Sequence, residues 1–209
     1  LAESSWGVEE IEALQEVIAS DRFTMGERVA LFEKNFAQKF GTSYALMTSS
    51  GSTANLIGIG ALFYRKNKPL HRGDEVIVPA VSWSTTYYPL HQYGLKLKFI
   101  DVELATLNLD ISQLENALTP KTRMVVAVNI LGNPCHLNLI REFCDKHDLI
   151  FFEDNCESLG AELNGKMCGT FGDFGTFSFF FSHHIATMEG GMLITNDEEF
   201  FHIAKSMQI

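Results

Sequence analysis

The sequence has no CxxC pair, no dense cluster of Lys and Arg, no run of 18 apolar residues and only 5 prolines. Without paired cysteines, a structural zinc site is disfavoured. The lack of a basic cluster, together with a formal net charge of −10, argues against binding to nucleic acid or to an anionic membrane. The short apolar runs argue against a transmembrane helix. Neither GxxxxGK(S/T) nor GxGxxG occurs, so sites for nucleoside triphosphates and dinucleotides are disfavoured as well.

What remains is the composition of a folded, reduced protein. With 46% hydrophobic residues, the chain is too apolar for intrinsic disorder, and 209 residues can bury a core without disulfides. The four cysteines are widely spaced and no secretory leader is recognisable, so we expect a cytoplasmic protein. The chain begins at Leu1 rather than Met and stops inside a helical pattern at Ile209, and we therefore expect a fragment of a longer protein.

Apolar strands alternate with amphipathic helices along most of the chain. Helical spacing is found around residues 11–18, 32–40, 56–63, 87–90, 111–118 and 137–144, and again after a cap at Asp197. Apolar runs predict strands at Tyr44–Met47, Glu75–Pro79, Leu97–Ile100, Met124–Val128, Leu149–Phe152, Ala161–Asn164, Gly175–Phe179 and Gly191–Thr195. This alternation favours one α/β domain with three layers, in which helices cover both faces of a mainly parallel sheet.

Ligands of open α/β sheets bind beyond the carboxyl ends of the strands, and four loops at such positions contain unusual residues. The small, hydroxyl-rich segment Ser49–Asn55 precedes a helix. It suits a phosphate group, or it is simply a capped helix start. The acidic segment Glu153–Glu157 follows a buried strand. A carboxylate there either pairs with a cation, such as a protonated heterocyclic nitrogen or a metal, or caps the next turn.

The other two loops contain histidine and tryptophan. His183 and His184 lie on a segment that we expect to be extended, so at most one of them enters a given pocket. That histidine could act as a general base, unless the pair simply lies at the surface; metal binding is disfavoured because no third ligand is near. Trp83 follows the strand at Glu75–Pro79 and either stacks on a flat ligand ring or belongs to the core.

The order of these four loops resembles that of fold-type I pyridoxal phosphate (PLP) enzymes of the DegT/DnrJ/StrS sugar aminotransferase family. The resemblance covers nearly the whole chain. The segments that carry it are Phe23–Glu27, Ser49–Asn55, Val78–Pro89, Glu153–Glu157 and Ser182–Gly191. It implies that residues 1–209 form the PLP-binding large domain, that a small C-terminal domain follows, and that two subunits form a homodimer with active sites at their interface.

The resemblance also implies roles for individual residues. The family's aminotransferases carry a lysine that binds the cofactor covalently, five residues after the position of Ser178. This chain has His183 there, as do the family's dehydratases that act on GDP-4-keto-6-deoxymannose, and His183 would be the general base. The remaining residues would bind the cofactor: Gly51, Ser52 and Ser178 at the phosphate, Trp83 on the ring, Asp154 at the pyridinium nitrogen, and Glu157, often glutamine in the family, at the 3-hydroxyl.

The implied reaction removes the 3-hydroxyl group of a nucleotide-linked 4-keto-6-deoxy sugar in deoxysugar and O-antigen biosynthesis. L-Glutamate would convert PLP to pyridoxamine phosphate (PMP), the form that reacts with the sugar. Three alternatives stay open. The protein could be an iron–sulfur-dependent dehydrase of a CDP-linked sugar, which also has histidine at this position. It could be an aminotransferase that uses Lys166 or a residue beyond Ile209, or a non-catalytic binding domain that has lost its lysine. The nucleotide and the stereochemistry of the sugar are not determined by the sequence.

Overall fold

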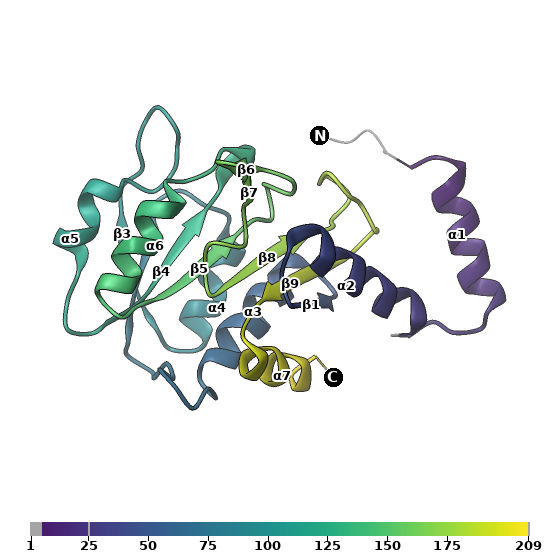
Figure 1. Ribbon diagram of the computed structural model, residues 1–209, viewed down its shortest axis with the longest axis horizontal. Coiled ribbons are helices and arrows are strands. Elements are labelled where there is room, and N and C mark those ends of the chain that lie inside the picture. Colours follow the sequence, from purple (N-terminus) through teal and green to yellow (C-terminus); the bar gives the residue numbers. More distant parts are fainter. Residues whose placement is uncertain (1–5, 25, 209) are drawn as a thin grey trace.

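A seven-stranded sheet runs through the middle of the molecule (Figure 1). The computed structural model describes residues 6–24 and 26–208, so Leu1, Ile209 and Met25 of the Phe23–Glu27 segment lie outside the described residues. In spatial order the strands are β1 (Tyr44–Thr48), β9 (Gly191–Thr195), β8 (Phe174–Ser178), β5 (Ile150–Asp154), β4 (Thr122–Val128), β2 (Glu75–Pro79) and β3 (Lys96–Ile100). Only β9 runs antiparallel to its neighbours in this sheet, which confirms the mainly parallel sheet expected from the sequence.

Helices cover both faces of this sheet (Figure 1). One face packs against α3 (Gly51–Leu62), α4 (Ser84–Gln92) and α7 (Glu198–Ser206), and the other against α2 (Glu27–Phe40), α5 (Leu114–Ala117) and α6 (Leu137–Lys146). Strand β5 shows how the sequence supports both layers: Phe152 packs on the α3 side, and its neighbour Phe151 packs on the α6 side. Because successive strand residues point to opposite faces, an unbroken apolar run is what a strand buried on both sides requires.

A predicted helix and a predicted strand that lie outside the seven-stranded sheet differ from the structure. The helix expected over residues 111–118 is a 3₁₀ turn, Ile111–Gln113, followed by the short α5, and the chain is already extended at Leu118, ahead of Pro120. The strand expected at Ala161–Asn164 is one half of a hairpin, β6 (Glu162–Leu163) and β7 (Lys166–Met167). Both residues of its Asn164-Gly165 turn have positive φ, the conformation that a two-residue type I′ turn requires.

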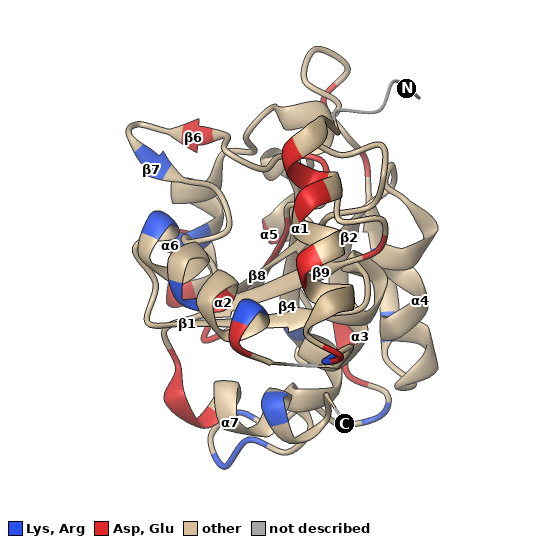
Figure 2. Ribbon diagram, turned by 90° about the vertical axis from the view of Figure 1, so that its right-hand side faces the viewer, with Lys and Arg blue, Asp and Glu red and all other residues tan. Residues whose placement is uncertain are grey.

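Helix α1 (Val8–Ala19) stands to one side of the sheet, and none of its residues is buried (Figure 1). Just before it, the indole N–H of Trp6 donates a hydrogen bond of 2.9 Å to the carbonyl of Ala186. Figure 2 shows acidic residues along α1 and interspersed acidic and basic positions over α6 and α7. Among the described residues, no helix is both long and apolar enough to cross a membrane.

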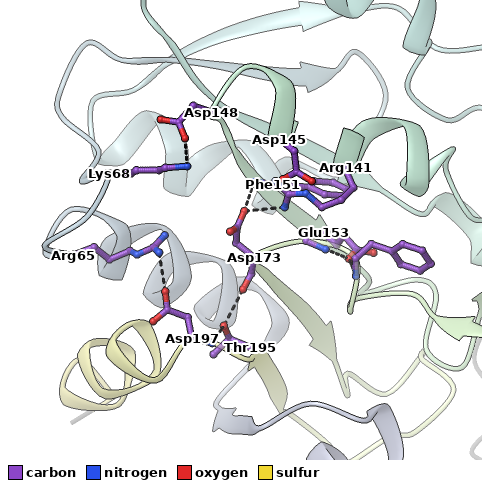
Figure 3. A network of polar contacts seen from close by, with 12 residues as sticks. Arg65, Lys68, Arg141, Asp145, Asp148, Phe151, Glu153, Asp173, Thr195 and Asp197 are labelled. Carbon is purple, nitrogen blue, oxygen red and sulfur yellow. Dashed lines mark hydrogen bonds and ion pairs between the residues drawn. The ribbon is translucent and has the colours of Figure 1, made fainter. Parts of the chain in front are cut away.

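Two carboxylates bind the turn before β8 to strand β5 (Figure 3). Asp173 accepts the backbone N–H of Phe151 at 2.7 Å and an Arg141 N–H at 3.2 Å. Glu153, which is fully buried, accepts three backbone N–H groups, those of Gly169, Phe171 and Gly172, at 2.6–2.7 Å. Burial raises the pKa of Glu153 to about 7, although these three donors act in the opposite direction. The pairing of β5 with β8 is therefore fixed by side chains as well as by strand hydrogen bonds.

Candidate active site

The carboxyl ends of β1, β2, β5 and β8 meet at one edge of the sheet. Every residue to which the sequence analysis assigned a role ends or follows one of these strands. They are Gly51 and Ser52 after β1, Trp83 after β2, Asp154 and Glu157 at and after β5, and Ser178 and His183 at and after β8.

The segment after β1 is a capped helix start that also offers free amides. The Ser50 hydroxyl accepts the N–H of Thr53 at 3.1 Å, so it is the cap of α3. Gly51 and Ser52 supply the first two N–H groups of the helix, which have no partner within it. A Cβ at Gly51 would lie 2.7 Å from both the Ser178 Cβ and the Cys156 Sγ. Glycine is thus required where α3 begins against the end of β8.

Asp154 is held from several sides. One of its oxygens, Oδ2, accepts the side-chain N–H of Asn55 at 3.0 Å and the hydroxyl of Thr86 at 2.8 Å. The other, Oδ1, accepts the backbone N–H of Cys156 at 3.2 Å. The predicted strand end at Phe152 is therefore wrong by two residues: β5 continues through Asp154 because donors from other elements compensate its buried carboxylates.

His183 lies in a turn, and the extended segment that we expected is wrong. Its backbone N–H donates to the carbonyl of Phe180 at 2.9 Å, which closes the turn. His183 is half-buried and His184 is exposed. Burial lowers the pKa of His183; the charges of Glu157 and Asp154 act against this shift, whereas His184 adds to it. The ring is therefore neutral near pH 7, the form that can accept a proton.

Three further side chains bear on the alternatives that the sequence left open for the site. They are those of Trp83, Glu157 and Lys166. Trp83 caps α4 and is 71% exposed, so it does not belong to the core. Glu157 accepts the backbone N–H of Leu131 at 3.0 Å, which joins the loop after β4 to the site. Lys166 is exposed, and its Nζ lies 4.3 Å from the ring centroid of Phe171, a core residue on the α6 side of the sheet. The described residues contain no group of three or more potential metal ligands.

Sequence reasoning gave no role to Asn55, Thr86 or Cys156, all of which contact Asp154 or Gly51. One signal was present for Asn55. It is followed in α3 only by apolar residues and glycine, and a polar side chain on such a helix must find a buried partner. Nothing in the sequence pattern identifies that partner, which lies 99 residues further along the chain.

Comparison with known proteins is consistent with this geometry. Residues 5–209 match the DegT/DnrJ/EryC1/StrS aminotransferase family. The chain is 57% identical over 203 residues to GDP-4-keto-6-deoxy-D-mannose 3-dehydratase of Yersinia pseudotuberculosis, covering 97% of this chain and 52% of that protein. It thus spans about half the length of the curated relatives that it matches.

Two crystal structures of GDP-4-keto-6-deoxymannose-3-dehydratase have the same fold as this chain. One, of a variant with bound GDP-perosamine, has a TM-score of 0.94 and 56% identity, covering 97% of this chain and 53% of that one. The other, with a trapped PLP–glutamate geminal diamine, has a TM-score of 0.95 and 56% identity, covering 98% and 53%. The fold class predicted from the sequence is confirmed.

Proposed function

Because the chain belongs to the DegT/DnrJ/EryC1/StrS aminotransferase family, we propose that it is the PLP-binding large domain of a sugar 3-dehydratase. The substrate is GDP-4-keto-6-deoxymannose, in line with its 57% identity to an enzyme of that name. The observation that carries the proposal is His183. A half-buried histidine, rather than a lysine, lies beside the charges of Asp154 and Glu157, so this site can move a proton but cannot attach a carbonyl cofactor covalently.

The residues at the sheet edge fit the cofactor. The Gly51 and Ser52 amides and the Ser178 hydroxyl hold the phosphate, at a place where a side chain on residue 51 would clash with Ser178. The exposed Trp83 covers one face of the ring, and the buried Asp154 pairs with the ring nitrogen. Glu157 faces the 3-hydroxyl. When bound, PLP would supply a ring that withdraws electrons and, in its PMP form, for which L-glutamate would be the amino donor, an amine for the sugar ketone.

The protein's own contribution to the chemistry is proton transfer. The lowered pKa of His183 keeps its imidazole neutral, so the ring takes up the proton whose removal precedes loss of the 3-hydroxyl group. A general base of this kind contributes about 10²–10⁴-fold to the rate. Asp154 and Glu157 lie close enough for their charges to act on the ring, and they stabilise the imidazolium that forms.

The second subunit and the rest of the enzyme belong to the same proposal. A homodimer completes the active site, a C-terminal domain follows residue 209, and the enzyme works in the cytoplasm. The four cysteines are free, which suits a reducing compartment. The aminotransferase alternative that relies on Lys166 is disfavoured, because this side chain lies over Phe171 on the α6 side of the sheet, whereas Asp154 contacts α3 and α4 on the other side.

The test uses the full-length protein with PLP, glutamate and a panel of GDP-, CDP- and dTDP-linked 4-keto-6-deoxyhexoses. We expect ammonia release and loss of the oxygen at carbon 3 with the GDP-linked sugar, and no covalent trapping of the cofactor by borohydride. An amino sugar as product, or cofactor trapped on a lysine, would contradict the proposal. Turnover that depends on bound iron would favour the iron–sulfur alternative.

A further inference from the structure

We propose that Asn55 and Thr86 are positioning residues for the ring nitrogen of the cofactor, because together they orient the Asp154 carboxylate by donating to the same one of its oxygens. The inference rests on the proposed function, since it assumes that Asp154 pairs with that nitrogen. It adds two residues from two different helices, α3 and α4, to the machinery of the site.

Both donors reach the same carboxylate oxygen. Asn55 is 0% exposed and Thr86 is 1% exposed, and they donate to Asp154 Oδ2 at 3.0 and 2.8 Å. Two donors use both lone pairs of that oxygen. Oδ1 accepts the Cys156 amide at the longer distance of 3.2 Å. The capacity to accept a further N–H therefore lies on Oδ1, and the plane of the carboxylate is fixed before any ligand binds.

The two donors are themselves oriented by further hydrogen bonds. Thr176 donates its hydroxyl to the Asn55 side-chain oxygen at 2.6 Å, which directs the Asn55 amide nitrogen to Asp154. The hydroxyls of Ser82 and Thr86 are 2.8 Å apart, and because Thr86 gives its only proton to Asp154, Ser82 donates to Thr86. Two chains of donors, one from β8 and one from the loop after β2, thus end on one oxygen, and such chains strengthen each other.

Hydrogen bonds donated to a carboxylate favour its charged form, and a charged carboxylate keeps a nearby pyridine nitrogen protonated. The other titratable groups that interact with Asp154 are Tyr87 on α4, Cys156 beside it and His183 after β8. Replacing Thr86 or Asn55 by an apolar residue leaves these titratable groups and Asp154 itself in place. A change in the protonation of the ring would therefore come from the lost donor.

The experiment compares Thr86→Val with the wild type, both as full-length holoenzyme loaded with PLP labelled with ¹⁵N in the ring. The ¹⁵N chemical shift reports directly whether the nitrogen carries a proton. We expect the pH at which the ring loses its proton to fall by about one unit or more in Thr86→Val, and the affinity for PLP to fall about tenfold. Thr86→Ser, which keeps the hydroxyl, should restore both.

The matched control is Thr195→Val, which removes the hydroxyl of another buried threonine, one that donates to the Asp173 carbonyl at 2.8 Å. Thr195 pairs with Phe174 at the start of β8, whereas the site lies at the other end of that strand, near Ser178. This variant should therefore lose stability without changing the ¹⁵N shift. Asn55→Leu provides a second variant if Thr86→Val does not fold. A wild-type holoenzyme with an unprotonated ring would refute the role of Asp154 in the proposed function, and the inference with it. A protonated wild-type ring whose shift is unchanged in both variants would overturn the inference alone.

Discussion

Replacing Gly191 with alanine tests how the phosphate end of the site is built. A Cβ at position 191 would meet the Ser50 carbonyl and would lie 2.6 Å from the Gly51 nitrogen. These are backbone atoms, so the clash is relieved only if β9 or the first turn of α3 moves. Overpacking of this kind costs about 1–3 kcal/mol. In a domain of this size each kcal/mol lowers Tm by about 2–4 °C, so we expect a loss of about 2–12 °C.

The same movement displaces the Gly51 and Ser52 amides, so PLP affinity should fall by about tenfold or more. Calorimetry measures the loss of Tm, and a PLP titration measures the loss of affinity. Gly190→Ala is the control, because the atoms nearest to its Cβ would be side-chain atoms, those of Thr187, Met47 and Phe179, and not backbone atoms of β9 or α3. If Gly191→Ala melts and binds PLP like Gly190→Ala, the close approach of β9 to α3 does not shape the phosphate site.

Three further predictions concern the loop that carries the base. His183→Asn should lower dehydration by about 10²–10⁴-fold and leave PLP binding, measured by equilibrium dialysis, unchanged; retained turnover would remove the role of His183. The Glu157 charge opposes the lowering of the His183 pKa by burial, so Glu157→Gln should lower that pKa further. The base must be neutral to act, so the acid limb of the kcat/KM profile should then move to lower pH, and a limb that moves upward would contradict the argument. Trp6→Phe removes the N–H that binds Ala186, so hydrogen exchange over residues 182–190 should accelerate and kcat should fall at unchanged PLP affinity. Unaltered exchange there would show that the N-terminal segment does not hold the loop.

The strands could be predicted from the sequence because their signal is local. Residues 75–79 and 191–195 were assigned to strands with the boundaries that the structure has, since unbroken apolar runs mark strands covered on both faces. The end of β5 could not be predicted in this way. Burying Glu153 and Asp154 is tolerable only with donors such as Gly169 and Asn55, and a local pattern contains no information about residues so far apart in the chain.

The same holds for the site: features with a local sequence signal could be predicted, and features that depend on residues far apart in the chain could not. The loop pattern indicated which residues lie at the sheet edge, and the structure places them at one edge. The conformation around His183 was predicted wrongly, because a turn closed by the Phe180 carbonyl leaves no periodic signal in the sequence. The exposure of Trp83 was equally undecidable from composition, since an aromatic residue after a buried strand is compatible with either environment.

Within the described part of the chain, no hydrogen bond reaches the imidazole of His183, and its one aromatic contact is with Phe180, edge-on, at a centroid distance of 6.4 Å. The backbone of this residue is held through its amide, which every amino acid except proline possesses. The backbone turn thus does not by itself specify which side chain projects here. A substitution at position 183 therefore leaves the hydrogen bond that closes this turn in place and changes the chemistry that the side chain offers.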